Sequence, residues 1–295
     1  MKQKWLAVGI ILLFVGTCII PAIAQTTEKP LPASRGNWLY VGGSGPGNYT
    51  WIQDAIDNAS DGDTVFVYDD SSPYPINGLK IEKSINLIGE NKTSTEIIGI
   101  TGINILADKV NISGFNIIIC PVVFGIRIFS NFNIIKDNII SNISEGNPIL
   151  LQHYSSNNSI YNNIIKNCGF FSLEYKNNHN RIFRNVIVNC HGLYLSHSNN
   201  NLIYENCFVH CQNGIYLDSC TGNQIIRNTF LFNSRDGYFE NSFFNTWLGN
   251  YWHRPRILPK VIFGYVSRYF PDGGISKYPL FRFDIRPALI PSNTP

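Results

Sequence analysis

Aromatic residues recur at a fixed spacing in the C-terminal half of the sequence. Tyr194, Tyr216 and Phe239 follow one another at steps of 22 and 23 residues. If successive repeats stack, their rings form a strip on the outer surface, and such a strip can stack on the apolar faces of sugar rings. In the other interpretation, the rings only stabilise cross-strand contacts and meet the C-terminal residues. This aromatic strip is the candidate ligand-binding site, with glycans as the candidate partners.

Metal chemistry would fall to the histidines and cysteines. Copper prefers His, Cys and Met ligands. His191 and His197, which lie near Cys190, are the candidate metal ligands, and Cys207 is a further thiol that strand alternation places outward. No two histidines have the i, i+2 or i, i+4 spacing of a compact site. Met1 is the only methionine, which excludes a Met-rich Cu(I) site.

Carboxylates provide the alternative chemistry, that of a polysaccharide lyase or hydrolase. Glu174 and Asp218 share one position of the repeat but stand two repeats apart, with Ser196 between them. A glycoside hydrolase needs two carboxylates facing one cleft, as acid and as base or nucleophile. The spacing favours a protein that binds and does not catalyse, and three carboxylates converging on one point would favour the enzyme.

Charged residues alternate in sign at another position of the repeat. Arg184, Glu205 and Arg227 follow Asp137 and Asn162 in the same frame. We expect ion pairs between neighbouring repeats, each contributing about 0–1 kcal/mol to stability if exposed. The functional alternative is that the arginines bind the carboxylate of an acidic sugar or act as a base.

The elements that must position these residues are the units of a repeat. The frame is Asn, any residue, a large apolar residue, any two residues, Asn, and it begins at Asn133, Asn158, Asn180, Asn201, Asn223 and Asn245. A fixed period of about 22 residues indicates stacked units that bury their apolar faces against one another. Within each unit apolar residues alternate with period two, which is typical of strands. The sequence therefore predicts an all-β, single-stranded parallel β-helix.

Residues one repeat apart should form ladders, since paired strands lie about 4.8 Å apart. One predicted ladder consists of asparagines, whose amides can bond the backbone or the next unit, and comprises Asn138, Asn163, Asn185, Asn206, Asn228 and Asn250. A second contains Cys120, Ile143, Cys168, Cys190 and Cys211. Because Ile143 shares its register, we expect inward-facing free thiols. A disulfide between Cys190 and Cys211 is the alternative.

The two ends of the sequence differ from the repeat. Residues 1–24 carry Lys2, Lys4, an apolar run and a small-x-small motif, which predicts a signal peptide, or an uncleaved anchor, and an extracytoplasmic protein. Residues 25–37 read as a linker, and 38–252 as the β-helix. Within the β-helix, 38–70 form an N-terminal cap whose short helix carries a capping-box signature, Thr50 and Gln53. Residues 253–295 are predicted to fold back as an aromatic C-terminal cap. The net charge of +3 over 295 residues gives no indication of a nucleic-acid partner.

The opening "YTWIQDAIDNASDGDTVFVY", the following "KSINLIGEN" and the "NxIxxNxI" units resemble pectin-lyase-like right-handed β-helix proteins. The repeats most resemble the NosD family, described as periplasmic copper-binding β-helix proteins. This resemblance implies a right-handed solenoid and makes copper a possible cofactor. It also implies an accessory role in metal delivery, with a membrane transporter or an exported metalloenzyme as partner. We therefore expect an exported, non-catalytic β-helix scaffold for binding, linked to glycans or copper.

Overall fold

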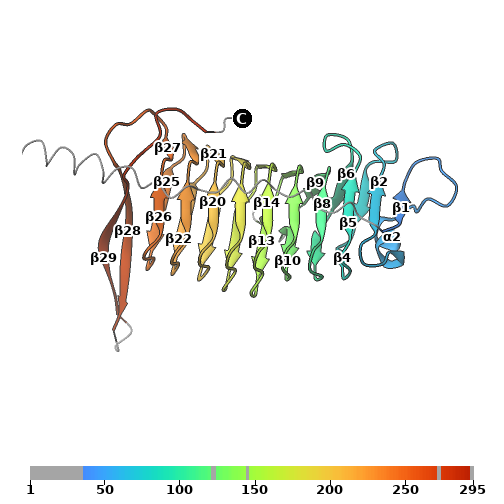
Figure 1. Ribbon diagram of the computed structural model, residues 1–295, viewed down its shortest axis with the longest axis horizontal. Helices are drawn as coiled ribbons and strands as arrows, with labels where there is room; N and C mark the ends of the chain where they lie inside the picture. Colours follow the sequence, from blue (N-terminus) through green and yellow to red (C-terminus); the bar gives the residue numbers. More distant parts are fainter. Residues whose placement is uncertain (1–35, 121–123, 144–145, 271–273, 293–295) are drawn as a thin grey trace, which may run out of the picture. The chain divides into compact units, whose positions relative to one another are not determined.

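The computed structural model describes residues 36–120, 124–143, 146–270 and 274–292. The predicted signal peptide, 1–24, and almost all of the predicted linker, 25–37, lie outside them. The described chain is the expected right-handed parallel β-helix. Each turn of the solenoid, or rung, contributes one strand to each of three columns, and strands within a column pair in parallel with the rungs before and after (Figure 1).

The first column contains β1 (Trp38–Val41), β2 (Thr64–Val67), β5 (Asn86–Gly89), β8 (Asn111–Ser113), β11 (Ile134–Lys136), β14 (Ser159–Tyr161), β17 (Arg181–Phe183), β20 (Leu202–Tyr204), β23 (Gln224–Ile226) and β26 (Thr246–Leu248). The second, a nine-stranded sheet, contains β3 (Tyr74–Ile76), β6 (Glu96–Gly99), β9 (Asn116–Ile119), β12 (Ile139–Ser141), β15 (Ile164–Lys166), β18 (Val186–Val188), β21 (Cys207–Val209), β24 (Thr229–Leu231) and β27 (Tyr251–Trp252). The third contains β4 (Leu79–Ile81), β7 (Ile103–Ile105), β10 (Phe124–Ile128), β13 (Asn147–Gln152), β16 (Phe170–Glu174), β19 (Gly192–Ser196), β22 (Asn213–Asp218) and β25 (Arg235–Glu240).

Apolar side chains fill the interior of the solenoid. In the first column, one inward position is occupied on successive rungs by the fully buried Ile112, Ile135, Ile160, Ile182, Ile203 and Ile225. Because side chains alternate across a strand, the neighbouring positions face outward. The interior is thus a packed core, and the outer surfaces of the columns are the places where a ligand can be met.

The chain turns between columns at residues with left-handed backbone conformation. The predicted ion-pair ladder is one such corner: Asp137, Asn162, Arg184, Glu205 and Arg227 all have φ between 53° and 56°. The residue that follows each of them points inward and belongs to the Asn138–Asn250 ladder predicted above. We call this the second Asn ladder, because the first asparagines of the frames, from Asn133 to Asn245, form another ladder of amide bonds at the preceding corner. A left-handed residue is costly for most side chains, so we infer that the bonds of the second Asn ladder hold the corner.

Each member of the second Asn ladder is completely bonded. The Oδ1 atom of Asn185 accepts the backbone N–H of Asn163 at 3.1 Å and its Nδ2–H at 3.0 Å. The Nδ2 atom of Asn185 donates to the carbonyl of Ile160 at 2.9 Å and to Oδ1 of Asn206 at 3.0 Å. All these asparagines are fully buried. Since a buried polar group is costly unless bonded, this pattern fixes the register of the rungs.

The N-terminal region contains α2 (Ile52–Asn58), which buries Ile52, Ala55 and Ile56 and contacts β1, β2 and β4 (Figure 1). The predicted capping box does not form, because the N-cap residue is Trp51 and it makes no side-chain capping bond. The Gln53 side chain instead bonds the backbone of the next rung, accepting from the N–H of Lys80 at 2.9 Å and donating to its carbonyl at 3.1 Å.

After the last rung the chain forms an antiparallel hairpin of β28 (Lys260–Tyr269) and β29 (Ile275–Asp284). β28 pairs with β25, and β29 with β26, so the hairpin joins the first and third columns into one sheet (Figure 1). Beyond the hairpin, the N–H of Ala288 bonds the carbonyl of Asn250 at 2.9 Å. This part of the C-terminal tail therefore lies against the last rungs.

Six cysteines lie in the described chain, all as free thiols. Cys168, Cys190 and Cys211 face inward with Ile143, as expected. The exposure of two cysteines differs from the prediction. Cys120 is exposed and does not face inward. Cys207 is fully buried, although strand alternation places it outward. Burial raises the pKa of the Cys207 thiol to about 12, so neither its accessibility nor its charge state suits a surface metal ligand.

Candidate functional site

The outer surface of the third column and the hairpin carries the predicted aromatic strip in a modified form. Tyr194 pairs with Tyr216, and Tyr216 with Tyr238, in adjacent strands. Tyr238 then meets Tyr265 of the hairpin. The ring centroids are 5.0, 5.0 and 6.3 Å apart along this row, which we call the tyrosine strip. Phe170 precedes it, with its ring 5.6 Å from that of Tyr194.

The placement of Phe239 on this strip was wrong. Phe239 pairs with Leu217, points into the core and is 1% exposed, while Tyr238 occupies the outward position. The outward position was predicted one residue too late, and the inward residue Gly237, which precedes Tyr238, explains this error. A Cβ atom there would lie 3.0 Å from the indole of Trp247 and 3.4 Å from Ile262. Gly237 thus stands at an inward, core position.

A lane of acidic residues runs beside the tyrosine strip. Glu174, Ser196, Asp218 and Glu240 occupy the same register on four successive rungs. The hydroxyl of Tyr194 donates to Asp218 at 3.4 Å, and that of Tyr216 donates to Glu240 at 3.4 Å. These bonds tie the edge of each ring to the next rung and leave the lane lined with hydrogen-bond acceptors.

The carboxylates of this lane differ in their surroundings. Lys277 lies 2.8 Å from Glu240, and Ser267 donates to it at 2.6 Å, so these partners hold the pKa of Glu240 below its usual value. Burial raises the pKa of Glu174, against the effect of a hydrogen bond from Ser172. Burial also raises the pKa of the Tyr216 hydroxyl, with the charges of Asp218 and Glu240 adding to the effect. Tyr216 is therefore a neutral donor at any physiological pH.

A second aromatic column provides a comparison within the same molecule. Tyr161, Phe183 and Tyr204 lie on β14, β17 and β20, with centroids 4.6 and 4.7 Å apart and interplanar angles of 12° and 7°. Each ring face there is covered by the next ring. In the tyrosine strip the interplanar angles are 39°, 55° and 54°. Those rings are tilted and cover one another less completely than the rings stacked between Tyr161 and Tyr204.

The candidate metal ligands do not come together. His191 and His197 precede and follow β19, and six extended residues span roughly 20 Å. His197 instead stacks on Tyr175 at 6.2 Å, and its Nδ1 atom lies 3.0 Å from the hydroxyl oxygen of Ser196. His191 packs edge-on against Phe170. Within the described ranges no three His, Cys, Asp or Glu side chains are arranged to hold a metal ion, so these residues do not fit a copper site.

Arg184 and Glu205 form one step of the predicted ion-pair ladder. The Nε atom of Arg184 donates to Glu205 at 2.9 Å. The pair is largely exposed on the arginine side, so it contributes little to stability. Its position at a left-handed corner, one residue before the second Asn ladder, supports the structural interpretation of these charges.

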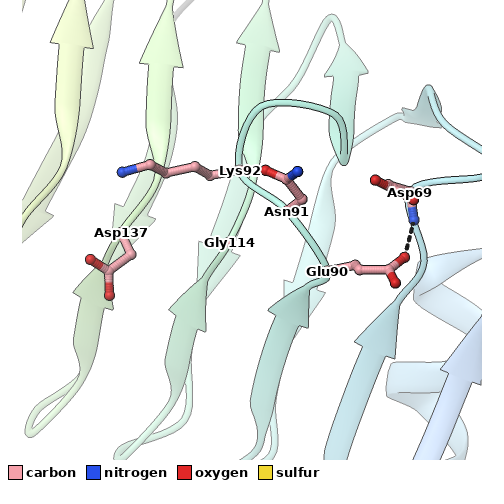
Figure 2. A pocket seen from close by; sticks show the side chains of 6 residues that line it. All are labelled: Asp69, Glu90, Asn91, Lys92, Gly114 and Asp137. Carbon is pink, nitrogen blue, oxygen red and sulfur yellow. Dashed lines mark hydrogen bonds between the residues drawn. The ribbon is translucent and has the colours of Figure 1, made fainter.

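A shallow depression near the N-terminal rungs gathers further carboxylates (Figure 2). Asp69, Glu90 and Asp137 line it together with Lys92, and the backbone N–H of Asp69 donates to Glu90 at 3.0 Å. Figure 2 shows the three acidic side chains spread over separate strands. They do not converge on one point, and among the described residues no three such side chains are grouped to hold a metal ion. Among the described helices, none is long and apolar enough to span a membrane.

Three solved structures illustrate the similarity of fold. They are a periplasmic alginate epimerase, AlgG (14% identity, TM-score 0.38, 70% of this chain and 61% of that one), the Dettilon tailspike protein (13%, 0.45, 72% and 54%) and the A-module of Azotobacter vinelandii mannuronan C-5 epimerase AlgE6 (13%, 0.39, 72% and 82%). The chain thus spans less than two thirds of the first two. At these identities the likeness concerns fold and not activity. A comparison with curated proteins gave no match.

The family is established by the sequence of the rungs themselves. The profile of the NosD family, described as periplasmic copper-binding protein, matches residues 56–257. This range begins in α2, includes the tyrosine strip as far as Tyr238 and ends just after the last rung. The chain belongs to the NosD family.

Proposed function

We propose that this NosD-family protein is an exported, non-catalytic scaffold that binds glycans along the tyrosine strip. The observation that carries the proposal is the shared register of Tyr194, Tyr216 and Tyr238, whose tilted rings continue onto the hairpin through the contact of Tyr238 with Tyr265. Sugar rings present apolar faces that pack on aromatic rings, and their hydroxyl groups need acceptors close by. The tyrosine strip offers the aromatic rings, and the acidic lane offers the hydrogen-bond acceptors.

The acidic lane also indicates which glycans fit. Glu174, Asp218 and Glu240 place negative charge beside the rings. An acidic polysaccharide would be repelled there, whereas neutral sugars and amino sugars can donate hydrogen bonds to the carboxylates. We therefore infer a neutral or amino-sugar chain lying across the rungs.

Binding is favoured over catalysis by the arrangement of the same carboxylates. Glu174 and Asp218 are two rungs apart, roughly 10 Å at the spacing of paired strands. Asp218 and Glu240 are on adjacent rungs, but the bonds from Lys277 and Ser267 hold Glu240 in its ionised form, which is unsuited to a general acid. The raised pKa of Glu174 is the one feature that suits an acid, and it keeps a hydrolase as the second candidate.

The copper named in the family description does not enter this proposal, because the described histidines and cysteines do not form a ligand set. A membrane transporter or an exported metalloenzyme would be a partner only in a copper role, so the proposal includes neither. Export rests on residues 1–24, whose pattern predicts a signal peptide.

Affinity electrophoresis against neutral, amino-sugar and acidic polysaccharides tests the proposal. Tyr216→Ala should weaken binding to the retained glycan by about 1.5 kcal/mol, roughly tenfold in Kd. Tyr161→Ala, in the stacked column, is the matched control and should bind as the wild type does. Equal losses in both variants, or no retention by any glycan, would contradict the proposal. Release of reducing ends that is lost in Glu174→Gln would establish the hydrolase instead.

A further inference from the structure

A pocket of about 300 Å³ lies where the last rung passes into the C-terminal tail. Its lining combines one acidic side chain with aromatic, amide and basic ones, and comprises Phe232, Asn233, Asp236, Trp252, His253, Arg254 and Arg256. Phe232 is 59% exposed, stacks on His210 at 5.2 Å and meets His253 edge-on at 4.6 Å, so an aromatic wall borders the opening. The pocket is separate from the second Asn ladder, which faces the core.

Positive charge exceeds negative charge around this pocket. Arg254 and Arg256 line it, and Lys260 stands beside it, with its Nζ atom 5.5 Å from the Trp252 ring and 3.8 Å from the Asp236 carboxylate. Asp236 is the acidic residue in the lining, and it also accepts from Asn233 at 3.3 Å. One carboxylate therefore shares this region with three basic side chains.

Two further observations indicate that this charge is not balanced within the described chain. The Nε atom of Arg256 is buried and has no hydrogen-bond partner among the residues that the structure describes. A buried donor left unpaired is costly, and buried polar groups usually have a partner. Burial lowers the pKa of Lys260; Asp236 opposes this effect, while the charges of Arg256 and Arg254 add to it.

We propose that this pocket binds a compact oxyanion, with Arg254, Arg256 and Lys260 as its ligands. A planar guanidinium fits the oxygens of a carboxylate, sulfate or phosphate, and an oxyanion would supply the acceptor that the Arg256 Nε–H lacks. Two sources share this chemistry: a free inorganic anion, and the acidic group of a saccharide whose ring rests against Phe232. The site is independent of the tyrosine strip, whose acidic lane would repel the same ligand.

Calorimetric titration of the full chain tests the site with sodium sulfate, sodium phosphate and galacturonate, against sodium chloride at equal ionic strength. Galactose, which lacks the carboxylate, is the reference for galacturonate. We expect saturable binding of at least one oxyanion and none of chloride or galactose. Arg254→Gln/Arg256→Gln should weaken it at least tenfold. Arg268→Gln, which removes the same charge from the exposed part of β28, should leave it within twofold.

Asp236→Asn should change the affinity for the oxyanion in the opposite direction. A gain of affinity cannot be explained by misfolding of the variant. Removing the one acidic group should tighten oxyanion binding severalfold, in a protein whose melting temperature in chloride is close to that of the wild type. Sulfate binding alone would identify a free anion as the ligand, and tighter galacturonate binding would identify a saccharide. The proposal is overturned if no oxyanion binds in preference to chloride, or if the double arginine variant binds as the wild type does.

Discussion

Asp284 closes the second Asn ladder, and its replacement by alanine tests how the solenoid is held at its C-terminal end. Its Oδ2 atom accepts from the backbone N–H of Asn250 at 2.8 Å, from its Nδ2–H at 3.0 Å and from Nε1–H of Trp252 at 3.0 Å. The Oδ1 atom accepts from the N–H of Gly249 at 3.1 Å. Oδ1 also accepts from the N–H of Arg286 at 3.2 Å. Asp284→Ala therefore removes five acceptor contacts at once.

The expected loss follows from burial. Asn250 and Asp284 are fully buried and Trp252 is 1% exposed, so three of the five donors lose their partner away from water. An unsatisfied buried donor costs about 1–3 kcal/mol. Allowing for relaxation and water entry, we expect destabilisation by about 3–5 kcal/mol. Stacked repeats unfold in parts, so the loss should appear first at the last rungs.

Urea unfolding followed by tryptophan fluorescence, with hydrogen exchange of the Asn250 and Trp252 amides, measures this effect. Asp108→Ala is the control, because Asp108 is exposed and accepts one backbone N–H, from Asn131 at 2.7 Å. It should cost less than about 1 kcal/mol. The reasoning is wrong if Asp284→Ala is no more destabilising than Asp108→Ala, or if exchange accelerates first at the N-terminal rungs.

Two further predictions concern titratable groups. Lys277 and Ser267 depress the folded-state pKa of Glu240. The stability that Glu240 contributes is therefore present above the unfolded value of about 4.3 and is lost as pH falls through the folded pKa. Glu240→Gln should lower the urea midpoint more at pH 7 than at pH 3, and an equal difference at both would refute the assignment. Among the described cysteines, Cys120 is exposed and should react with Ellman's reagent in the native protein. Burial raises the pKa of Cys207 and of Cys220 to about 12, so these thiols should react only in denaturant. Rapid labelling of more than one thiol in the native protein would contradict this.

The period of the asparagines was sufficient to predict the fold and most of the register. The rungs from Asn138 to Asn250 repeat the same corner, a left-handed residue followed by an inward Asn, and this corner is visible in the sequence as the end of the frame Asn-x-apolar-x-x-Asn. The ladder from Asn138 to Asn250 and the outward alignment of Tyr194 with Tyr216 follow directly from it. A local rule repeated many times can be read from a single sequence.

The failures lie where one rung departs from the rule or where distant residues decide burial. Gly237 looks like the glycine that begins the earlier frames, but it makes space for Trp247, and a one-residue shift exchanges the inward and outward faces. The spacing of the frames therefore places Phe239 on the outer face, although Tyr238 occupies that position. Cys207 occupies an outward position that is nevertheless covered, and alternation within a strand contains no information about such cover.

The repeat pattern does not predict the pocket that Arg254 and Arg256 line. Arg254 and Arg256 lie after the last frame and Lys260 begins the hairpin, so their approach to Asp236 depends on how the tail leaves the solenoid. The sequence does carry one signal, a group of basic residues directly after the final Asn-rich unit. That signal gives composition but not convergence, and convergence is what makes a binding site.

The two Asn-rich corners explain why the outer surface is free to carry a ligand site. Inner amides such as those of Asn185 bond both neighbouring rungs, so the register does not depend on the outward side chains. Outer lanes can then vary from rung to rung, as Glu174, Ser196 and Asp218 do at one position. The alignment of Tyr194, Tyr216 and Tyr238 in one outer lane is therefore not required by the register of the rungs, which is why we propose a ligand for it.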